Sequence, residues 1–138
     1  MPKFRFAVLH AALCLVLLAP AAADAAGRKA APPALAQIDA DQSGTISADE
    51  VKAAADKRFD ALDTDHSGKL DAKELAGILS ARAQKKADAD KDGTLDKAEF
   101  ESIAAYHFQK ADKDQNGTLD VKEQKSYQGK TLAKLLGL

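Results

Sequence analysis

The sequence is short of several residue types that small domains use for stability or chemistry. It has one cysteine, one methionine and no tryptophan, and aromatic residues make up 5% of the chain. The cysteine, Cys14, lies in an apolar N-terminal run, so the remainder can form no disulfide and no cysteine ligand set for zinc. The single methionine is Met1, which argues against a Met-rich binding surface. No basic patch interleaved with aromatic residues is present, so nucleic acid is not an expected partner.

The first residues have the pattern of a cleavable secretory signal. A basic start, Lys3 and Arg5, precedes an almost wholly apolar run over residues 6–19, and small residues follow it. The run is shorter than the roughly 20 residues that span a bilayer, so an N-terminal membrane anchor is the weaker alternative. We expect a signal peptide over residues 1–23, with cleavage near Ala23. The mature protein would then be periplasmic or secreted, without membrane association.

One acidic sequence motif, Asp-x-Asp-x-(Ser/Asp/Asn)-Gly-x-x-x-x-x-Glu, occurs four times. The copies start at Asp39, Asp63, Asp88 and Asp112, at intervals of 24, 25 and 24 residues. Each copy matches an EF-hand loop, in which oxygens at positions 1, 3, 5, 7, 9 and 12 surround a Ca²⁺-sized cation and a glycine at position 6 allows a sharp turn. We therefore predict four metal loops, numbered 1 to 4 along the chain, that hold up to four Ca²⁺ ions.

The predicted ligands follow from these loop positions. They are Asp39, Asp41, Ser43, Thr45, Ser47 and Glu50 in loop 1; Asp63, Asp65, Ser67, Lys69, Asp71 and Glu74 in loop 2; Asp88, Asp90, Asp92, Thr94, Asp96 and Glu99 in loop 3; and Asp112, Asp114, Asn116, Thr118, Asp120 and Glu123 in loop 4. Position 7 contributes its backbone carbonyl oxygen, so the Lys69 side chain is expected to point outward. Loop 3 has the most carboxylates and loop 1 the fewest. Affinity generally rises with ligand charge, so we expect loop 3 to bind tightest and loop 1 weakest.

A helix capping box is the main alternative interpretation of each motif, because the residues at positions 9 and 12 fit the N-cap and N3 positions of such a box. The pairs are Ser47/Glu50, Asp71/Glu74, Asp96/Glu99 and Asp120/Glu123. A single motif could be no more than such a box. Four copies in register, each with glycine at position 6 and an apolar residue at position 8, favour metal loops in which both roles coexist.

The chain is an internal duplication, because a shift of 49 residues superimposes Asp39 on Asp88 and Phe59 on Phe108. The predicted divisions are a flexible leader over residues 24–34 and one four-EF-hand domain over residues 35–138, built from two repeats at about 35–83 and 84–132. Large apolar residues are sparse in this domain and much of the apolar content is alanine. A core of this kind is marginal, and bound metal is a common remedy.

Only twelve or thirteen residues separate one loop from the next, which leaves room for a single shared helix. The three segments have apolar residues at helical spacing and no proline. A helix of this length spans about 18–20 Å, so consecutive loops would lie too far apart to pair unless the helix breaks. Bridges through the position-8 residues should therefore join non-consecutive loops; these residues are Ile46, Leu70, Leu95 and Leu119.

The expected fold class is all-α: a compact EF-hand helical bundle with four metal loops joined by single shared helices. After Glu123 we expect a short helix that is interrupted at Gly129. Its leucines, Leu132, Leu135 and Leu136, form an apolar patch that can close the bundle.

The loops and their spacing resemble the lanmodulin family, the periplasmic lanthanide-binding proteins of methylotrophic bacteria. The resemblance covers nearly the whole chain after the signal peptide. It is based on the loop spacing and on short sequences such as Asp92-Gly93-Thr94-Leu95-Asp96-Lys97. It implies a small helical bundle with peripheral metal sites that compacts on metal binding. The family typically has proline at loop position 2, where this chain has Ala40, Thr64, Ala89 and Lys113. Loop 1 has Ser43 and Ser47 where a lanthanide-preferring loop would have aspartate, so Ca²⁺ is the expected ion and a lanthanide the alternative.

These features favour an exported metal-ion buffer or carrier with metal-coupled folding. The alternative is a metal-dependent sensor that exposes a surface to an unidentified periplasmic protein partner. An enzyme is not expected, because the sequence has no His-x-x-x-His and no nucleophile–base arrangement. His66, at loop position 4, is expected to face solvent, and His107, beside Phe108, to serve in packing or at the surface.

Overall fold

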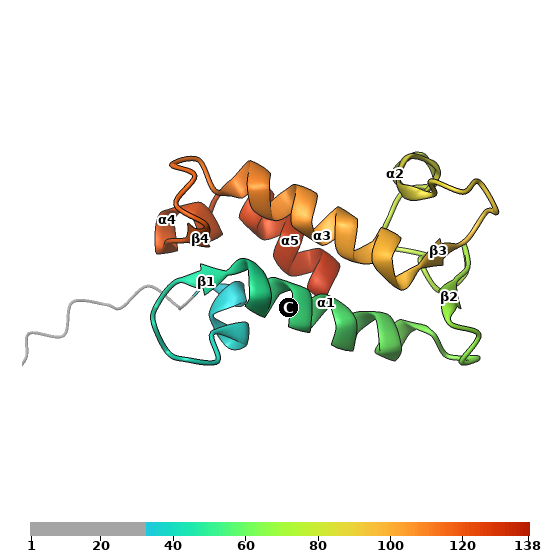
Figure 1. Cartoon of the computed structure of the whole chain (residues 1–138), viewed down its shortest axis with the longest axis horizontal. Coiled ribbons are helices and arrows are strands. Elements are labelled where there is room, and N and C mark those ends of the chain that lie inside the picture. Colours follow the sequence, from blue (N-terminus) through green and yellow to red (C-terminus); the bar gives the residue numbers. More distant parts are fainter. Residues whose placement is uncertain (1–32) are drawn as a thin grey trace, which may run out of the picture.

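Figure 1 shows the computed structural model, which describes residues 33–138. The predicted signal peptide and all but the last two residues of the predicted leader lie outside this range. In chain order the elements are the 3-10 helix η1 (Ala34–Ile38), β1 (Ile46–Ser47), α1 (Ala48–Leu62), β2 (Lys69–Leu70), α2 (Ala81–Ala87), β3 (Leu95–Asp96), α3 (Lys97–Ala111), β4 (Thr118–Leu119), α4 (Val121–Gln124) and α5 (Tyr127–Leu136). Among the described residues helices dominate and every strand has two residues, so the predicted all-α bundle is confirmed. Within the described part, no helix is both long and apolar enough to cross a membrane.

The long helices α1 and α3 form the centre of the bundle and run antiparallel, side by side (Figure 1). Each begins at a capping box, and each buries apolar residues at intervals of three or four. Phe59 of α1 and Phe100 of α3 meet edge to face, with ring centroids 6.1 Å apart and an interplanar angle of 64°. This is a favoured geometry for aromatic pairs, and it helps to set which faces of the two helices meet.

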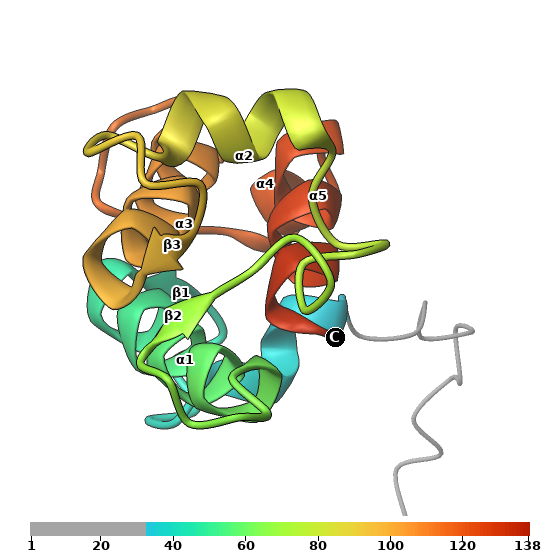
Figure 2. The ribbon, with the colours of Figure 1, turned by 90° about the vertical axis from the view of Figure 1, so that its right-hand side faces the viewer.

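Helix α5 packs against α3 and, more sparingly, against α1 and η1 (Figure 2). Its residues Leu132, Leu135 and Leu136 are buried, which confirms the predicted closing patch. The core also holds the position-8 residue of every loop, each 0% exposed: Ile46, Leu70, Leu95 and Leu119. The metal loops are therefore anchored in the core by their own residues.

The loops pair in a way that follows the duplication. β1 pairs with β4 through Ile46 and Leu119, and β2 pairs with β3 through Leu70 and Leu95, both antiparallel. The repeat shift carries Ile46 to Leu95 and Leu70 to Leu119, so it converts one pair into the other. The two repeats are therefore related by an approximate two-fold axis, with loops 1 and 4 at one end of the α1–α3 pair and loops 2 and 3 at the other (Figure 1).

The pairing of loops 2 and 3 corrects the prediction that consecutive loops stay apart. That prediction needed a continuous helix over residues 75–87, but residues 72–78 form turns, and α2 starts only after its N-cap, Ser80. Gly77 has a φ of +79°, a conformation that side chains disfavour. The glycine breaks the helix, and loops 2 and 3 can then meet. Loops 1 and 4 are non-consecutive, as predicted.

The C-terminal segment also differs from the prediction. The helix breaks between α4 and α5, where Ser126 caps α5 by accepting a hydrogen bond from the Gly129 amide at 3.1 Å. Gly129 itself lies inside α5. A Cβ at this residue would lie 2.4 Å from the backbone carbonyl oxygens of both Glu123 and Gln124. The glycine therefore allows α5 to pass close to α4, and does not end a helix.

Candidate metal centre

All four loops share one backbone conformation. Position 4 has a positive φ between 57° and 61° in Gln42, His66, Lys91 and Gln115. Position 6 is a glycine with a φ between 78° and 90° in Gly44, Gly68, Gly93 and Gly117. Two left-handed residues within three positions wind the chain tightly, so that the start of each loop faces its end. This is the turn for which an EF-hand loop needs its glycine.

Each loop brings three carboxylates together, from positions 1, 3 and 12. One oxygen of each carboxylate lies within 4.8 Å of the other two. The triads are Asp39/Asp41/Glu50, Asp63/Asp65/Glu74, Asp88/Asp90/Glu99 and Asp112/Asp114/Glu123. Carboxylates at this separation repel one another when ionised, and a multivalent cation between them turns repulsion into attraction.

Backbone amides hold the triads in place. In loop 1, Asp39 accepts hydrogen bonds from the amides of Ser43 at 3.0 Å and Gly44 at 2.9 Å. Glu50 accepts from the amide of position 2 at 2.7 Å and from that of Ser47 at 2.9 Å. The same contacts recur in loops 2 and 3. The Ser47 amide contributes most to a lowered pKa of Glu50, which keeps this carboxylate ionised and ready for a cation.

The predicted ligands at positions 5 and 7 contact one another. Ser43 and Ser67 donate their hydroxyl hydrogens to the position-7 carbonyl oxygens of their loops, at 3.1 and 2.9 Å. Asp92 and Asn116 instead accept hydrogen bonds from the threonine at position 7. None of these side chains belongs to a carboxylate triad.

The predicted ligands at position 9 cap the following segment. Their side chains accept a hydrogen bond from the amide of position 12; the residues are Ser47, Asp71, Asp96 and Asp120. Three of the four pairs form complete capping boxes at the starts of α1, α3 and α4. Asp71 and Glu74 make the same reciprocal bonds at the start of a turn. The capping interpretation therefore holds alongside the carboxylate triads.

Loop 4 contains a carboxylate oxygen that lacks a protein partner. In loops 1 to 3 the Oδ1 atom of position 1 accepts from the amide of position 5. In loop 4 the corresponding atom, Asp112 Oδ1, is buried and has no hydrogen-bond partner in the described part of the chain. A buried carboxylate oxygen without a partner is costly, and a cation among Asp112, Asp114 and Glu123 would remove that cost. The triads offer only oxygen, which suits a hard cation such as Ca²⁺.

The two histidines in the described range, His66 and His107, lie outside the triads. His66 is exposed at position 4 of loop 2, as predicted. His107 of α3 lies within hydrogen-bond distance of Gln128 of α5, with its Nδ1 atom 2.8 Å from Gln128 Oε1. His107 thus contributes to helix packing, one of its two predicted roles.

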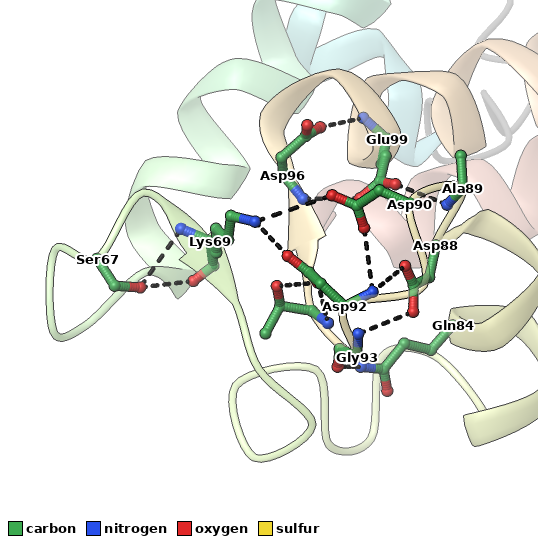
Figure 3. Close-up of polar contacts among 11 residues, drawn as sticks. Ser67, Lys69, Gln84, Asp88, Ala89, Asp90, Asp92, Gly93, Asp96 and Glu99 are labelled. Atoms are coloured by element: carbon green, nitrogen blue, oxygen red, sulfur yellow. Dashed lines mark hydrogen bonds and ion pairs between the residues drawn. The ribbon is translucent and has the colours of Figure 1, made fainter.

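A contact between loops 2 and 3 involves the Lys69 side chain, which we expected to point outward from loop 2. The Lys69 ammonium forms an ion pair with Asp92 and lies 4.0 Å from Asp90 Oδ2 (Figure 3). The side chain does point out of its own loop and is exposed, as expected, and strand pairing places it beside loop 3. The only signal in the sequence is a lysine where the other three loops have threonine. The hydrogen bond from Lys69, followed by those from Thr94, lowers the pKa of Asp92 to about 2, and Asp92 raises the pKa of Lys69.

Comparison with known protein families agrees with this geometry. A family model described as EF hand matches residues 34–53, 55–79, 85–104 and 105–123. Each match contains one complete loop, and together the matches cover more than half of the chain. A search of curated proteins found no match. EF-hand loops bind Ca²⁺ through the positions that form the four triads. Because it has four such loops and the family model matches each of them, the chain belongs to the EF-hand family.

Proposed function

We propose that the protein is an exported EF-hand protein that binds Ca²⁺ as a buffer or carrier, is not an enzyme, and couples its folding to metal binding. The observation that carries this proposal is the set of four triads, each with three carboxylate oxygens within 4.8 Å of one another. The basic start and apolar run of the first 23 residues support export.

Coupling between metal binding and folding is supported by the anchoring of the loops. The position-8 residue of each loop is fully buried and lies between two predicted ligands. Without a cation, repulsion within a triad opposes the tight loop and therefore weakens the core contacts of that residue. Metal binding would restore the tight loop and the core contacts of the position-8 residue, so the free energy of binding contributes to the free energy of folding.

Ca²⁺ is the ion that the donor sets favour. Loop 1 has three carboxylates, and its serines at positions 5 and 9 are neutral. A trivalent cation gains more from each added carboxylate than Ca²⁺ does, so loops with few carboxylates discriminate less in its favour. Lanthanide binding is the alternative ion preference, and the loop spacing shared with lanmodulins supports it.

A titration followed by circular dichroism tests the proposal. Residues 24–138 would be stripped of metal and titrated with Ca²⁺, and separately with La³⁺, from chelator-buffered solutions. We expect helicity to rise with Ca²⁺. A variant with glutamine at position 12 of all four loops is the matched control and should respond far less. Absence of a response to either ion would contradict metal binding, and equal responses at similar free-ion concentrations would contradict lanthanide selectivity.

A sensor is the second candidate, and one observation favours it. An open groove of about 890 Å³ lies between α1 and α3, lined in part by Ala48, Val51, Ala105 and Phe108. It reaches Asp112 and Gly117 of loop 4, so metal in that loop could alter its shape. Metal-dependent fluorescence of an apolar dye such as ANS would support a sensor. Equal dye binding with and without Ca²⁺ would favour the buffer or carrier.

Export has a separate test. The full chain would be expressed in a Gram-negative host, and the N-terminus of the periplasmic protein would be sequenced. We expect a start near Asp24. Retention of the intact chain in the cytoplasm would contradict export and leave the metal-binding proposal unaffected.

A further inference from the structure

We propose that Lys69 of loop 2 is a tethered cation that competes with metal ions for loop 3 and weakens binding there. This inference rests on the proposed metal-binding function and assigns to Lys69 a role in setting the affinity of the neighbouring loop. The backbone carbonyl of Lys69 remains a predicted ligand of loop 2. Its side chain acts on a different loop.

The geometry shows how the ammonium reaches loop 3. Lys69 lies on β2 and faces Asp96 of β3 in the strand register. From there its side chain forms an ion pair with Asp92, the predicted position-5 ligand, and lies 4.0 Å from Asp90 of the loop 3 triad (Figure 3). Within residues 33–138, no other lysine or arginine forms an ion pair with a predicted metal ligand. The ammonium therefore occupies part of the carboxylate set that a metal ion would use.

The other loop pair provides an internal comparison. The repeat shift carries Lys69 to Thr118 and Asp92 to Ser43. The equivalent contact between loops 4 and 1 thus has neither the cation nor the anion. Because the backbone arrangement is the same in both pairs, the difference lies in these side chains and not in the fold.

The ammonium offsets the charge advantage of loop 3. Loop 3 has five carboxylates and loop 4 has four, but the Lys69 charge reduces the net charge of the loop 3 site by one. A metal ion must share the Asp92 carboxylate with Lys69 or displace the ammonium, and in either case it binds with a positive charge nearby. A unit charge within about 5–7 Å of a divalent ion at the protein surface changes affinity by roughly threefold or more. Loop 3 should therefore bind no more tightly than loop 4 in the natural protein.

The test substitutes Lys69→Thr, the residue that the other loops have at position 7. Ca²⁺ would be titrated into the metal-free protein, with the Gly93 amide resonance reporting on loop 3 and the Gly117 resonance on loop 4. We expect Kd for loop 3 to fall by about threefold or more in low salt, with little change for loop 4. The difference should shrink in about 1 M KCl, because salt screens exposed charges.

Two further variants separate this role from a general charge effect. Lys91→Asn removes a lysine from loop 3 that forms no ion pair among the described residues, and asparagine tolerates its left-handed backbone. It should raise loop 3 affinity less than Lys69→Thr does. In a protein that also carries Asp92→Asn, the effect of Lys69→Thr on the free energy of Ca²⁺ binding in loop 3 should be at least halved.

Three results would overturn the proposal: no change for loop 3 in Lys69→Thr, an equal change in Lys91→Asn, or an undiminished effect in the Asp92→Asn background. If none of the proteins binds Ca²⁺, the proposed function has failed and the competition with it. If all bind and Lys69→Thr matches the natural protein, only the competition has failed.

Discussion

Lys52 of α1 and Glu101 of α3 are equivalent residues of the two repeats, 49 positions apart, and their side chains form an ion pair. The approximate two-fold axis that exchanges the repeats therefore passes between them. If both repeats carried the same residue here, two like charges would face each other. Opposite charges at this position favour the pairing of each repeat with the other and disfavour pairing of identical repeats from two chains.

This relationship predicts the effect of a charge reversal. Lys52→Glu places two carboxylates at the axis and should lower the thermal midpoint of the Ca²⁺-bound protein, measured by circular dichroism. The decrease should be small because Lys52 is exposed to solvent. The double variant Lys52→Glu/Glu101→Lys restores the pair and should recover most of the midpoint. Lys57→Glu, on the same helix, is the control, and a decrease as large as that of Lys52→Glu would contradict this role.

The edge-to-face contact of Phe59 and Phe100 should be a principal source of stability. Phe100 is 0% exposed, and truncation of such a phenylalanine to alanine costs about 3–5 kcal/mol. Urea unfolding of Phe100→Ala in saturating Ca²⁺ should show this loss of unfolding free energy. Tyr106→Ala, 47% exposed on the same helix, should cost less than about 1 kcal/mol. A loss for Phe100→Ala as small as that of Tyr106→Ala would contradict this role of the Phe59–Phe100 contact.

Gly129 should be essential to the contact between α4 and α5. Gly129→Ala brings a methyl group against the carbonyl oxygens of Glu123 and Gln124, and we expect a loss of about 1–3 kcal/mol in unfolding free energy. Because Glu123 is the position-12 residue of loop 4, Ca²⁺ binding in loop 4 should weaken more than in loop 2. Lys130→Ala, on the exposed side of the same helix, should change neither quantity. Unchanged stability of Gly129→Ala would contradict the close approach.

The pairing of loops 1 and 4 predicts which sites depend on one another. Glu50→Gln removes a triad carboxylate from loop 1, and β1 transmits the change to loop 4 through Ile46 and Leu119. We expect the free energy of Ca²⁺ binding in loop 4 to weaken by roughly 0.5 kcal/mol or more. Loop 2, which follows loop 1 in the chain, should change less. Titrations that follow the Gly117 and Gly68 amide resonances measure the two effects, and the reverse order would contradict the observed strand pairing.

Much of the candidate site could be read from the sequence because it is local. Positions 1, 3 and 12 lie within one loop, and the glycine at position 6 and the caps at positions 9 and 12 act over a few residues. Helices α1 and α3 were predictable for the same reason, since each combines a capping box with an apolar stripe. The break at Gly77 was not, because the apolar residues around it have helical spacing and glycine permits, but does not require, a left-handed turn.

Sequence by itself determined that this protein has four acidic loops on a compressed repeat, with a buried residue in each. Tertiary structure decided which loops face each other, since that depends on where the chain breaks between loops 2 and 3. It also decided the partner of Lys69, because strand pairing brings residues that are 23 positions apart into contact. The arrangement of the metal ligands arises from contacts within twelve residues of one loop. The Lys69 ammonium beside the loop 3 ligands comes from another loop, so only the folded chain reveals it.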